Sequence, residues 1–318
     1  MPSSPQPTAD QAPGAYDSAR GALHILLLLS GFAGLGYEMV WTRAVSVALG
    51  HEIVAVLAVI AAFFAGLAIG AWALDGRIRK SQFPGRWYTG LEIVIGTWSL
   101  LLIVLIPVFN DVMAVAIGIQ PSPLRHWGSV FVGTLLLFLP ATVAMGATLP
   151  AVERLLTGLA ASRRGVAGLY AANTFGAVLG TLVTTIAIVP LIGTKATLIL
   201  LAAVNFTCAA GVLMIRGGKP VDPAPVGIDS APAAGRLAFV LALTGFLGVG
   251  YEVLVIRALS QVLENTVYTF AVLLAVYLLG TALGAAVYQR VAPRGGFGKK
   301  SSRIRTIGGI PNRARLSS

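Results

Sequence analysis

The sequence predicts an all-α polytopic membrane protein with about eight transmembrane helices, and three observations predict this fold class. Apolar residues make up 56% of the 318-residue chain and charged residues 11%, with a mean hydropathy of +0.83; a soluble domain carries about 25% charged residues. The apolar residues gather in long runs, and a membrane helix needs about 20 of them. One pair of runs is repeated, because 31–71 and 245–285 align without a gap and are identical at 15 of 41 positions.

The elements of the first part of the chain follow from this pattern. Residues 1–21, rich in Pro, Ala, Ser and Gln, are typical of a disordered N-terminal tail. Residues 22–215 then form a six-helix membrane half. Its helices are expected at roughly 22–41, 52–74, 88–109, 127–149, 166–190 and 196–215, because each run is long enough to span.

The second part of the chain is shorter. A Pro- and Ala-rich linker, 216–235, precedes the first two helices of a second half, 236–289, expected at roughly 237–256 and 266–288. Residues 290–318 are rich in Arg, Gly and Ser and contain no acidic residue. Such a segment is typical of a basic cytosolic tail, and also of a non-native end from a shifted frame or a truncated gene; we expect the second.

The basic residues predict the orientation. With the N-terminus in the cytoplasm, the inner segments before the tail hold 11 Lys and Arg residues and the outer segments hold 4, as the positive-inside rule requires. We therefore expect a multi-pass protein of a bacterial-type plasma (inner) membrane, with the linker in the cytoplasm and the lipid bilayer as its main partner. The net charge of +11 falls to +3 without the 8 basic residues of the tail. No basic-aromatic pattern indicates a nucleic-acid partner.

The repeat also predicts how the halves are related. Six helices separate the starts of the two copies, so both copies have the same direction in the membrane. Two parallel six-helix halves joined by a cytoplasmic linker are the plan of the major facilitator transporters. Residues 70–80, GAWALDGRIRK, partly resemble the major facilitator loop signature through Asp75 and Arg77, and we expect a cytoplasmic loop there.

Four motifs together resemble a more specific family. They are G-x-x-G-x-x-Y-E-x-x-x-x-R at 31–43, A-x-x-x-G-L-A-x-G at 62–70, GATLP at 146–150 and LYAANTFGAVLG at 169–180. They resemble the membrane region of fused major-facilitator/spermidine-synthase-like proteins, over roughly 25–290. The resemblance implies a soluble aminopropyltransferase-like domain that binds decarboxylated S-adenosylmethionine and a polyamine. Nothing after residue 290 matches such a domain, so we assign no catalytic residue, no cofactor and no enzymatic activity to this chain.

The charged residues of the repeated helices are the first candidate site. Glu38 and Arg43 in one copy correspond to Glu252 and Arg257 in the other. Each pair is five residues apart, about 140° around a helix, and so does not share a face. Repeat symmetry predicts that Glu38 pairs with Arg257. It likewise predicts that Glu252 pairs with Arg43. These residues either lock helices together or form a substrate or proton site, since charges inside a membrane usually face the bundle.

Three more polar residues are candidates. Glu92 is interpreted either as a site residue or as an interfacial residue on the cytoplasmic side. Asn173 and Asn205 lie inside predicted helices, where Asn either joins helices or contacts a ligand. The three histidines are scattered and Cys208 is the lone cysteine, so no metal site is predicted.

These observations leave three classes of function. The first is the membrane portion of a spermidine-synthase-like fusion, an anchor or a conduit for a small substrate such as a polyamine. The second is a stand-alone secondary transporter-like protein for a small cationic solute. The third is a scaffold that transports nothing.

Overall fold

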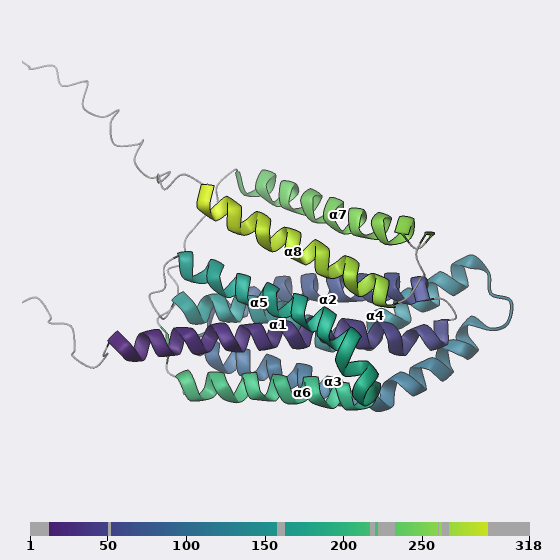
Figure 1. Ribbon diagram of the computed structural model, residues 1–318, viewed down its shortest axis with the longest axis horizontal. Helices are drawn as coiled ribbons and strands as arrows, with labels where there is room; N and C mark the ends of the chain where they lie inside the picture. Colours follow the sequence, from purple (N-terminus) through teal and green to yellow (C-terminus); the bar gives the residue numbers. More distant parts are fainter. Residues whose placement is uncertain are drawn as a thin grey trace, which may run out of the picture. The chain divides into compact units, whose positions relative to one another are not determined.

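A computed structural model describes residues 13–49, 52–157, 163–216, 220–221, 233–259, 261–262 and 267–291, and all regular secondary structure in these ranges is helical (Figure 1). The helices are α1 (Pro13–Leu49), α2 (Glu52–Lys80), α3 (Pro84–Ile117), α4 (Pro123–Thr157), α5 (Arg163–Val183), the π-helix η1 (Thr184–Ile188), α6 (Val189–Arg216), α7 (Ala233–Leu259) and α8 (Val267–Val291). Residues 1–12 of the expected tail, most of the linker 216–235 and residues 292–318 lie outside the described residues. Helix α1 begins at Pro13, inside the segment that the composition predicts to be a tail.

Seven helical runs of the described chain are long and apolar enough to cross a membrane, which confirms a helical membrane protein. The fifth run, Gly168–Ile215, contains 48 residues. A straight helix of this length would measure about 72 Å, more than twice a bilayer core of about 30 Å. The run instead folds back, and so supplies both the fifth and the sixth predicted helices (Figure 1).

The fold-back has a local cause in two residues. Pro190 has no backbone N–H and leaves a carbonyl one turn earlier without its helical partner. The helix widens just before it into η1, where the Val189 N–H donates to the Thr184 carbonyl. Gly193 then adopts φ 79° and ψ 168°, outside the helical region, a conformation open to glycine because it lacks a Cβ.

Two glycine seams join helices of the first half in pairs, α1 with α5 and α2 with α4. On α1 and α5, Gly31 lies against the backbone carbonyl of Asn173, and Gly180 lies against that of Phe32. On α2 and α4, Gly70 lies against the carbonyl of Val143. A Cβ at any of these positions would collide with backbone, so the close approach of the helices requires glycine. Helix α1 contacts α2, α3, α5 and α6 and is therefore the central helix of this half.

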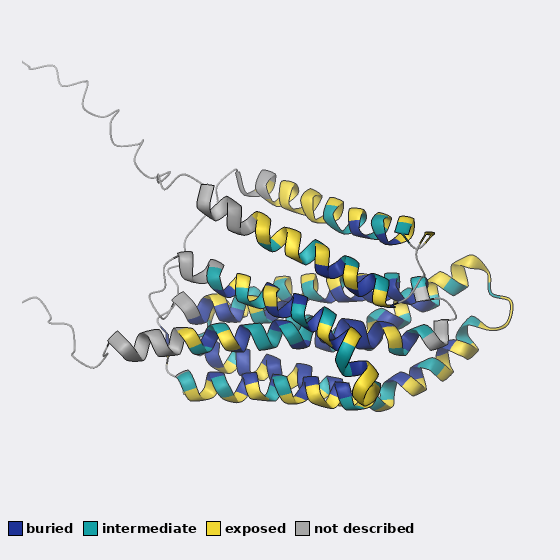
Figure 2. Cartoon of the chain, in the orientation of Figure 1, coloured by how far each residue is buried: buried dark blue, intermediate teal, exposed yellow. Residues whose placement is uncertain are grey.

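The second half is much more exposed. Residues Met1–Ala282 form one compact unit, and Leu283–Ser318 form a second, to which the end of α8 belongs. In the most apolar stretch of α7, 11% of the residues are buried, against 56% in the most apolar stretch of α1. Figure 2 shows α7 exposed along most of its length. An apolar cluster joins α7 and α8 to α1 and α2. Its members are Met39, Val56, Ile60, Ile256, Phe270, Ala271 and Leu274.

One prediction about a loop was wrong. Asp75 and Arg77 lie in the last turns of α2, which continues to Lys80, and not in a loop. The helix continues because Ile78 is fully buried and because Asp75 and Arg79, one turn apart, form an ion pair of 2.9 Å. Pro84 then opens α3 at a position where proline is favoured.

Candidate functional site

The first candidate site is a polar network around the carboxylate of Glu92. Glu92 lies on α3 and is fully buried. The Ser30 hydroxyl of α1 donates to Glu92 Oε1 at 2.7 Å, and Asn205 Nδ2 of α6 donates to Glu92 Oε2 at 2.6 Å. Three helices that are distant in sequence therefore converge on one carboxyl group. The Glu92 side chain is therefore enclosed by α1, α3 and α6.

Asn205 extends the network by one more residue. Its Oδ1 accepts a hydrogen bond of 2.7 Å from the hydroxyl of Tyr37, which is fully buried on α1. Asn205 thus uses both ends of its amide, one for Tyr37 and the other for Glu92. The result is a continuous path of hydrogen bonds from Tyr37 through Asn205 to Glu92.

The hydrogen-bond donors to Glu92 are neutral. They are a hydroxyl and an amide. A buried charge without compensation is costly, so such a carboxylate either takes up a proton or attracts a cation. The chemistry of this site is therefore that of a cation or proton acceptor.

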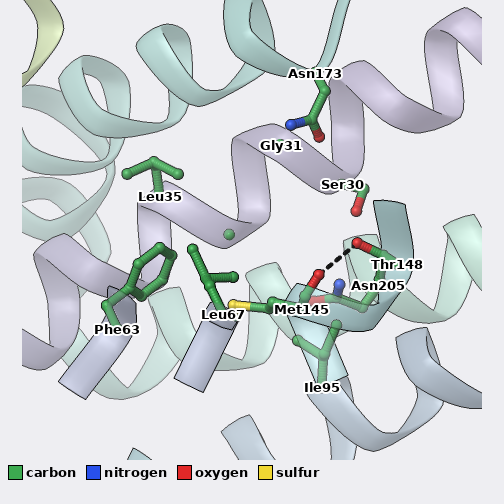
Figure 3. Close-up of a pocket in the computed structure, with 11 residues that line it drawn as sticks. Ser30, Gly31, Leu35, Phe63, Leu67, Ile95, Met145, Thr148, Asn173 and Asn205 are labelled. Carbon is green, nitrogen blue, oxygen red and sulfur yellow. Dashed lines mark hydrogen bonds between the residues drawn. The ribbon is translucent and has the colours of Figure 1, made fainter. Parts of the chain in front are cut away.

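A cavity of about 130 Å³ lies beside the network. Ser30 and Asn205 belong to both, and all six helices of the first half contribute to its lining. Figure 3 shows that the polar side chains Ser30, Thr148, Asn173 and Asn205 gather on one side of the cavity. The opposite side is apolar and is formed by Leu35, Phe63 and Leu67 (Figure 3).

Two residues of the cavity are held by the backbone around them. Asn173 lines the cavity from α5, and its backbone carbonyl lies against Gly31. The Thr148 hydroxyl donates to the Met145 carbonyl at 2.6 Å, the bond drawn in Figure 3. The cavity wall is thus built where the glycine seam brings α1 and α5 together.

The second candidate site lies on another side of α1. Glu38 follows Tyr37 directly, but adjacent residues of a helix point about 100° apart. Glu38 is 3% exposed, and its repeat equivalent Glu252 on α7 is 6% exposed. Neither carboxylate oxygen of Glu252 has a hydrogen-bond partner. The apolar cluster that contains Met39 and Ile256 brings the two helices together near these glutamates.

The predicted pairing of Glu252 with Arg43 is not formed. Arg43 and Arg257 both have exposed side chains, and the Glu252 oxygens accept no hydrogen bond from Arg43. Repeat symmetry predicts that each carboxylate faces the other copy's arginine. Each arginine, however, lies about 140° around its helix from its own glutamate.

The remaining predicted residues lie away from both sites. Asp75 pairs with Arg79 at the exposed end of α2, and Arg77 is exposed there too. Neither residue lines the cavity.

Ser30, Tyr37 and Thr148 were not among the site residues predicted from the sequence. Each is a hydroxyl inside a long apolar run, as in LLLLSGF around Ser30. That interruption was the available signal, and it was weak because single hydroxyl residues are common in membrane helices, where they bond to the carbonyl one turn earlier.

Comparison of the chain with models of protein families, with curated proteins and with solved structures finds no match. The resemblance described above thus depends on the sequence motifs alone.

Proposed function

We propose that this chain is a membrane conduit for a small organic cation, which binds in the cavity beside Glu92. A polyamine is the solute class that the sequence resemblance implies, and the chain would be the membrane portion of a spermidine-synthase-like fusion. The single observation that carries the proposal is the buried Glu92 carboxyl group, whose two hydrogen-bond donors are neutral.

The lining of the cavity supports an organic cation over a bare ion. The polar wall with Ser30 and Asn205 places Glu92 one side chain away from the cavity. In a low-dielectric interior, its charge attracts a cation across that distance more strongly than in water. The apolar wall with Leu35 and Phe63 suits the carbon chain of an amine.

The volume limits the size of the solute. The cavity of about 130 Å³ is similar to the cavity of about 150 Å³ known to hold benzene. Butane-1,4-diamine has as many non-hydrogen atoms as benzene and is the polyamine that fits best. A longer polyamine would need the helices to move apart.

The wider architecture belongs to the same proposal. Two parallel, major-facilitator-like halves, a cytoplasmic N-terminus and a bacterial-type inner membrane are supported by the repeat and by the 11 to 4 distribution of basic residues. A stand-alone secondary transporter for a small cation would use the same cavity, and uptake by the chain in the absence of any synthase domain would favour it.

The proposal is tested by solute binding to the full chain in lipid nanodiscs. We expect radiolabelled butane-1,4-diamine to bind to the native protein, and Glu92→Gln to weaken binding roughly tenfold to hundredfold. The substitution removes the negative charge that attracts the cation, and each 1.4 kcal/mol of lost attraction is about tenfold in affinity.

A matched control is Asp111→Asn, which makes the same chemical change at an exposed position of α3. It should bind the diamine as the native chain does. If native protein binds no diamine, or if Glu92→Gln binds it equally well, the cavity is not a cation site and an anchoring role becomes the better explanation.

A further inference from the structure

A second hollow lies at the turn between α2 and α3. It is an open groove of about 480 Å³, a volume within the range of sites that hold small organic ligands. The groove shares no lining residue with the cavity beside Glu92. It is therefore a separate feature of the chain, and what it binds does not depend on the proposed solute.

One end of the groove is polar and basic. Ser81 and Arg86 line it there, and Arg86 is exposed. The guanidinium carbon of Arg86 lies 4.5 Å from the centre of the Phe83 ring, a cation–π contact that holds the charge in place. A guanidinium stacked on a ring keeps its N–H donors at its edge, where they fit the oxygens of a phosphate group.

The other end of the groove is apolar and follows one face of α3. It is lined by Trp87, Gly90, Leu91 and Val94. Their spacing of three, four and seven residues places them on the same side of a helix. Gly90 creates the hollow, because it is exposed and a Cβ there would meet no atom within 4 Å. A larger side chain at this position would fill the groove.

The groove has the depth of one leaflet of a bilayer. The runs Ile53–Lys80 and Pro84–Ile117 are both membrane spans by length and composition, so the turn 81–83 between them lies at the membrane surface. Val94 lies eight residues beyond Arg86, about 12 Å along the helix axis. Half of a bilayer core is about 15 Å. The basic end therefore lies at the level of the lipid headgroups and the apolar end lies among the acyl chains.

The charge around the groove favours an anionic headgroup. Residues 75–87 contain four basic residues and one acidic residue, and the acidic one, Asp75, pairs with Arg79. Lys80 is exposed and directly precedes Ser81 of the groove. Basic residues beside a membrane helix attract anionic lipids. A zwitterionic headgroup gains less, because it adds a positive charge of its own.

We propose that this groove is a binding site for an anionic phospholipid. Arg86 binds the phosphate, and one acyl chain lies along α3 in the hollow at Gly90. Trp87 lies at the level between headgroup and acyl chain, where tryptophan is favoured. A free phosphate would contact only the basic end, so a lipid is the ligand that uses the whole groove.

The test is a titration of the full chain in detergent with phosphatidylglycerol, followed by native mass spectrometry. Phosphatidylcholine with the same acyl chains is the comparison, and we expect it to bind more weakly. Arg86→Gln should weaken phosphatidylglycerol binding about fivefold, the effect of one basic residue near an anionic membrane surface. Gly90→Leu keeps the charge but fills the groove, and it should weaken the binding of both lipids.

Two matched controls change the same residue types outside the groove. Arg77→Gln removes an exposed charge from α2. Gly128→Leu adds the same side chain at an exposed glycine of α4, where a Cβ would also meet no atom. Both variants should bind phosphatidylglycerol nearly as the native chain does.

Three outcomes would overturn the proposal. Equal binding of the two lipids would show that the headgroup charge is not recognised. Equal losses in Arg86→Gln and Arg77→Gln would show a diffuse attraction without a site. Displacement of phosphatidylglycerol by glycerol phosphate at a similar concentration would show that the ligand is a free phosphate, because this competitor has no acyl chain.

A second measurement uses the native chain and does not depend on how the variants fold. Phosphatidylglycerol with a photoreactive group in one acyl chain is cross-linked to the protein in nanodiscs, and the labelled peptides are identified. We expect the label to concentrate within residues 81–94. A label spread evenly over the exposed helices would contradict a specific site.

Discussion

The two copies of the repeat share a sequence pattern but have different surroundings. In the first copy, Gly31 is pressed against the backbone of α5, and Gly66 against Thr142 of α4. Their equivalents Gly245 and Gly280 have no atom near the position of a Cβ. The same glycines therefore form helix seams in one copy and face open space in the other. A small-residue motif shows that another helix can pack closely at that position. Whether one does so depends on which helices are its neighbours.

The largest difference in stability between the two copies is expected at Gly31 and Gly245, the first glycines that the copies share. Gly31→Ala should destabilise the chain by about 1–3 kcal/mol or more, because its new methyl group would meet the carbonyl of Asn173. Gly245→Ala should be neutral or stabilise α7 by up to about 1 kcal/mol, since alanine is the better helix former. Thermal unfolding in detergent measures both, and equal effects would contradict the difference between the copies.

A smaller effect is expected at the shared tyrosine. Tyr37 is fully buried and donates to Asn205, whereas its equivalent Tyr251 is 65% exposed. Removing the hydroxyl in Tyr37→Phe should cost about 0.5–1.5 kcal/mol, the net value of a typical hydrogen bond. Tyr251→Phe serves as the matched control and should unfold at the native temperature. If Tyr37→Phe also unfolds at the native temperature in the same assay, the path from Tyr37 to Glu92 contributes nothing to stability.

The smallest effect on stability is expected just after the repeat, at the end of α2. Asp75 pairs with Arg79 at the exposed end of α2, and the equivalent position on α8 is Gln289. Asp75→Asn should cost no more than about 0.5 kcal/mol, because water and salt screen exposed pairs. The difference between native and variant unfolding temperatures should disappear in high salt. A large loss that salt does not change would indicate a role for Asp75 beyond this pair.

The sequence predicted the helices well because the bilayer imposes one rule on every segment. Runs of about 20 apolar residues have to form helices to satisfy their backbone. It did not predict that α2 continues through Asp75 and Arg77, because charged residues after an apolar run indicate the end of a span and say little about the end of the helix. The fifth run is too long for one membrane helix, and Pro190 and Gly193 make it fold back through their local backbone geometry.

The sites were harder to predict than the helices. The sequence selected Glu38, Glu92, Asn173 and Glu252 as polar residues in apolar runs, and the structure buries the three glutamates and places Asn173 at the cavity. Their partners depend on the rotation of each helix about its own axis, which a repeat offset does not specify. Rotation is why the Glu252 oxygens do not meet Arg43. It is also why Asn205, for which a helix contact and a ligand contact were both expected, bridges Tyr37 and Glu92.

Tyr37 and Glu38 are consecutive residues of α1, and this has a thermodynamic consequence. A helix moves as a rigid rod, so a tilt or rotation of α1 that shifts Glu38 against the apolar cluster of α2, α7 and α8 also displaces the Tyr37 hydroxyl from Asn205. Movement at one of these places is therefore coupled to movement at the other, and such a coupling is reciprocal. Helix α1 thus links the packing of the first six helices to that of α7 and α8.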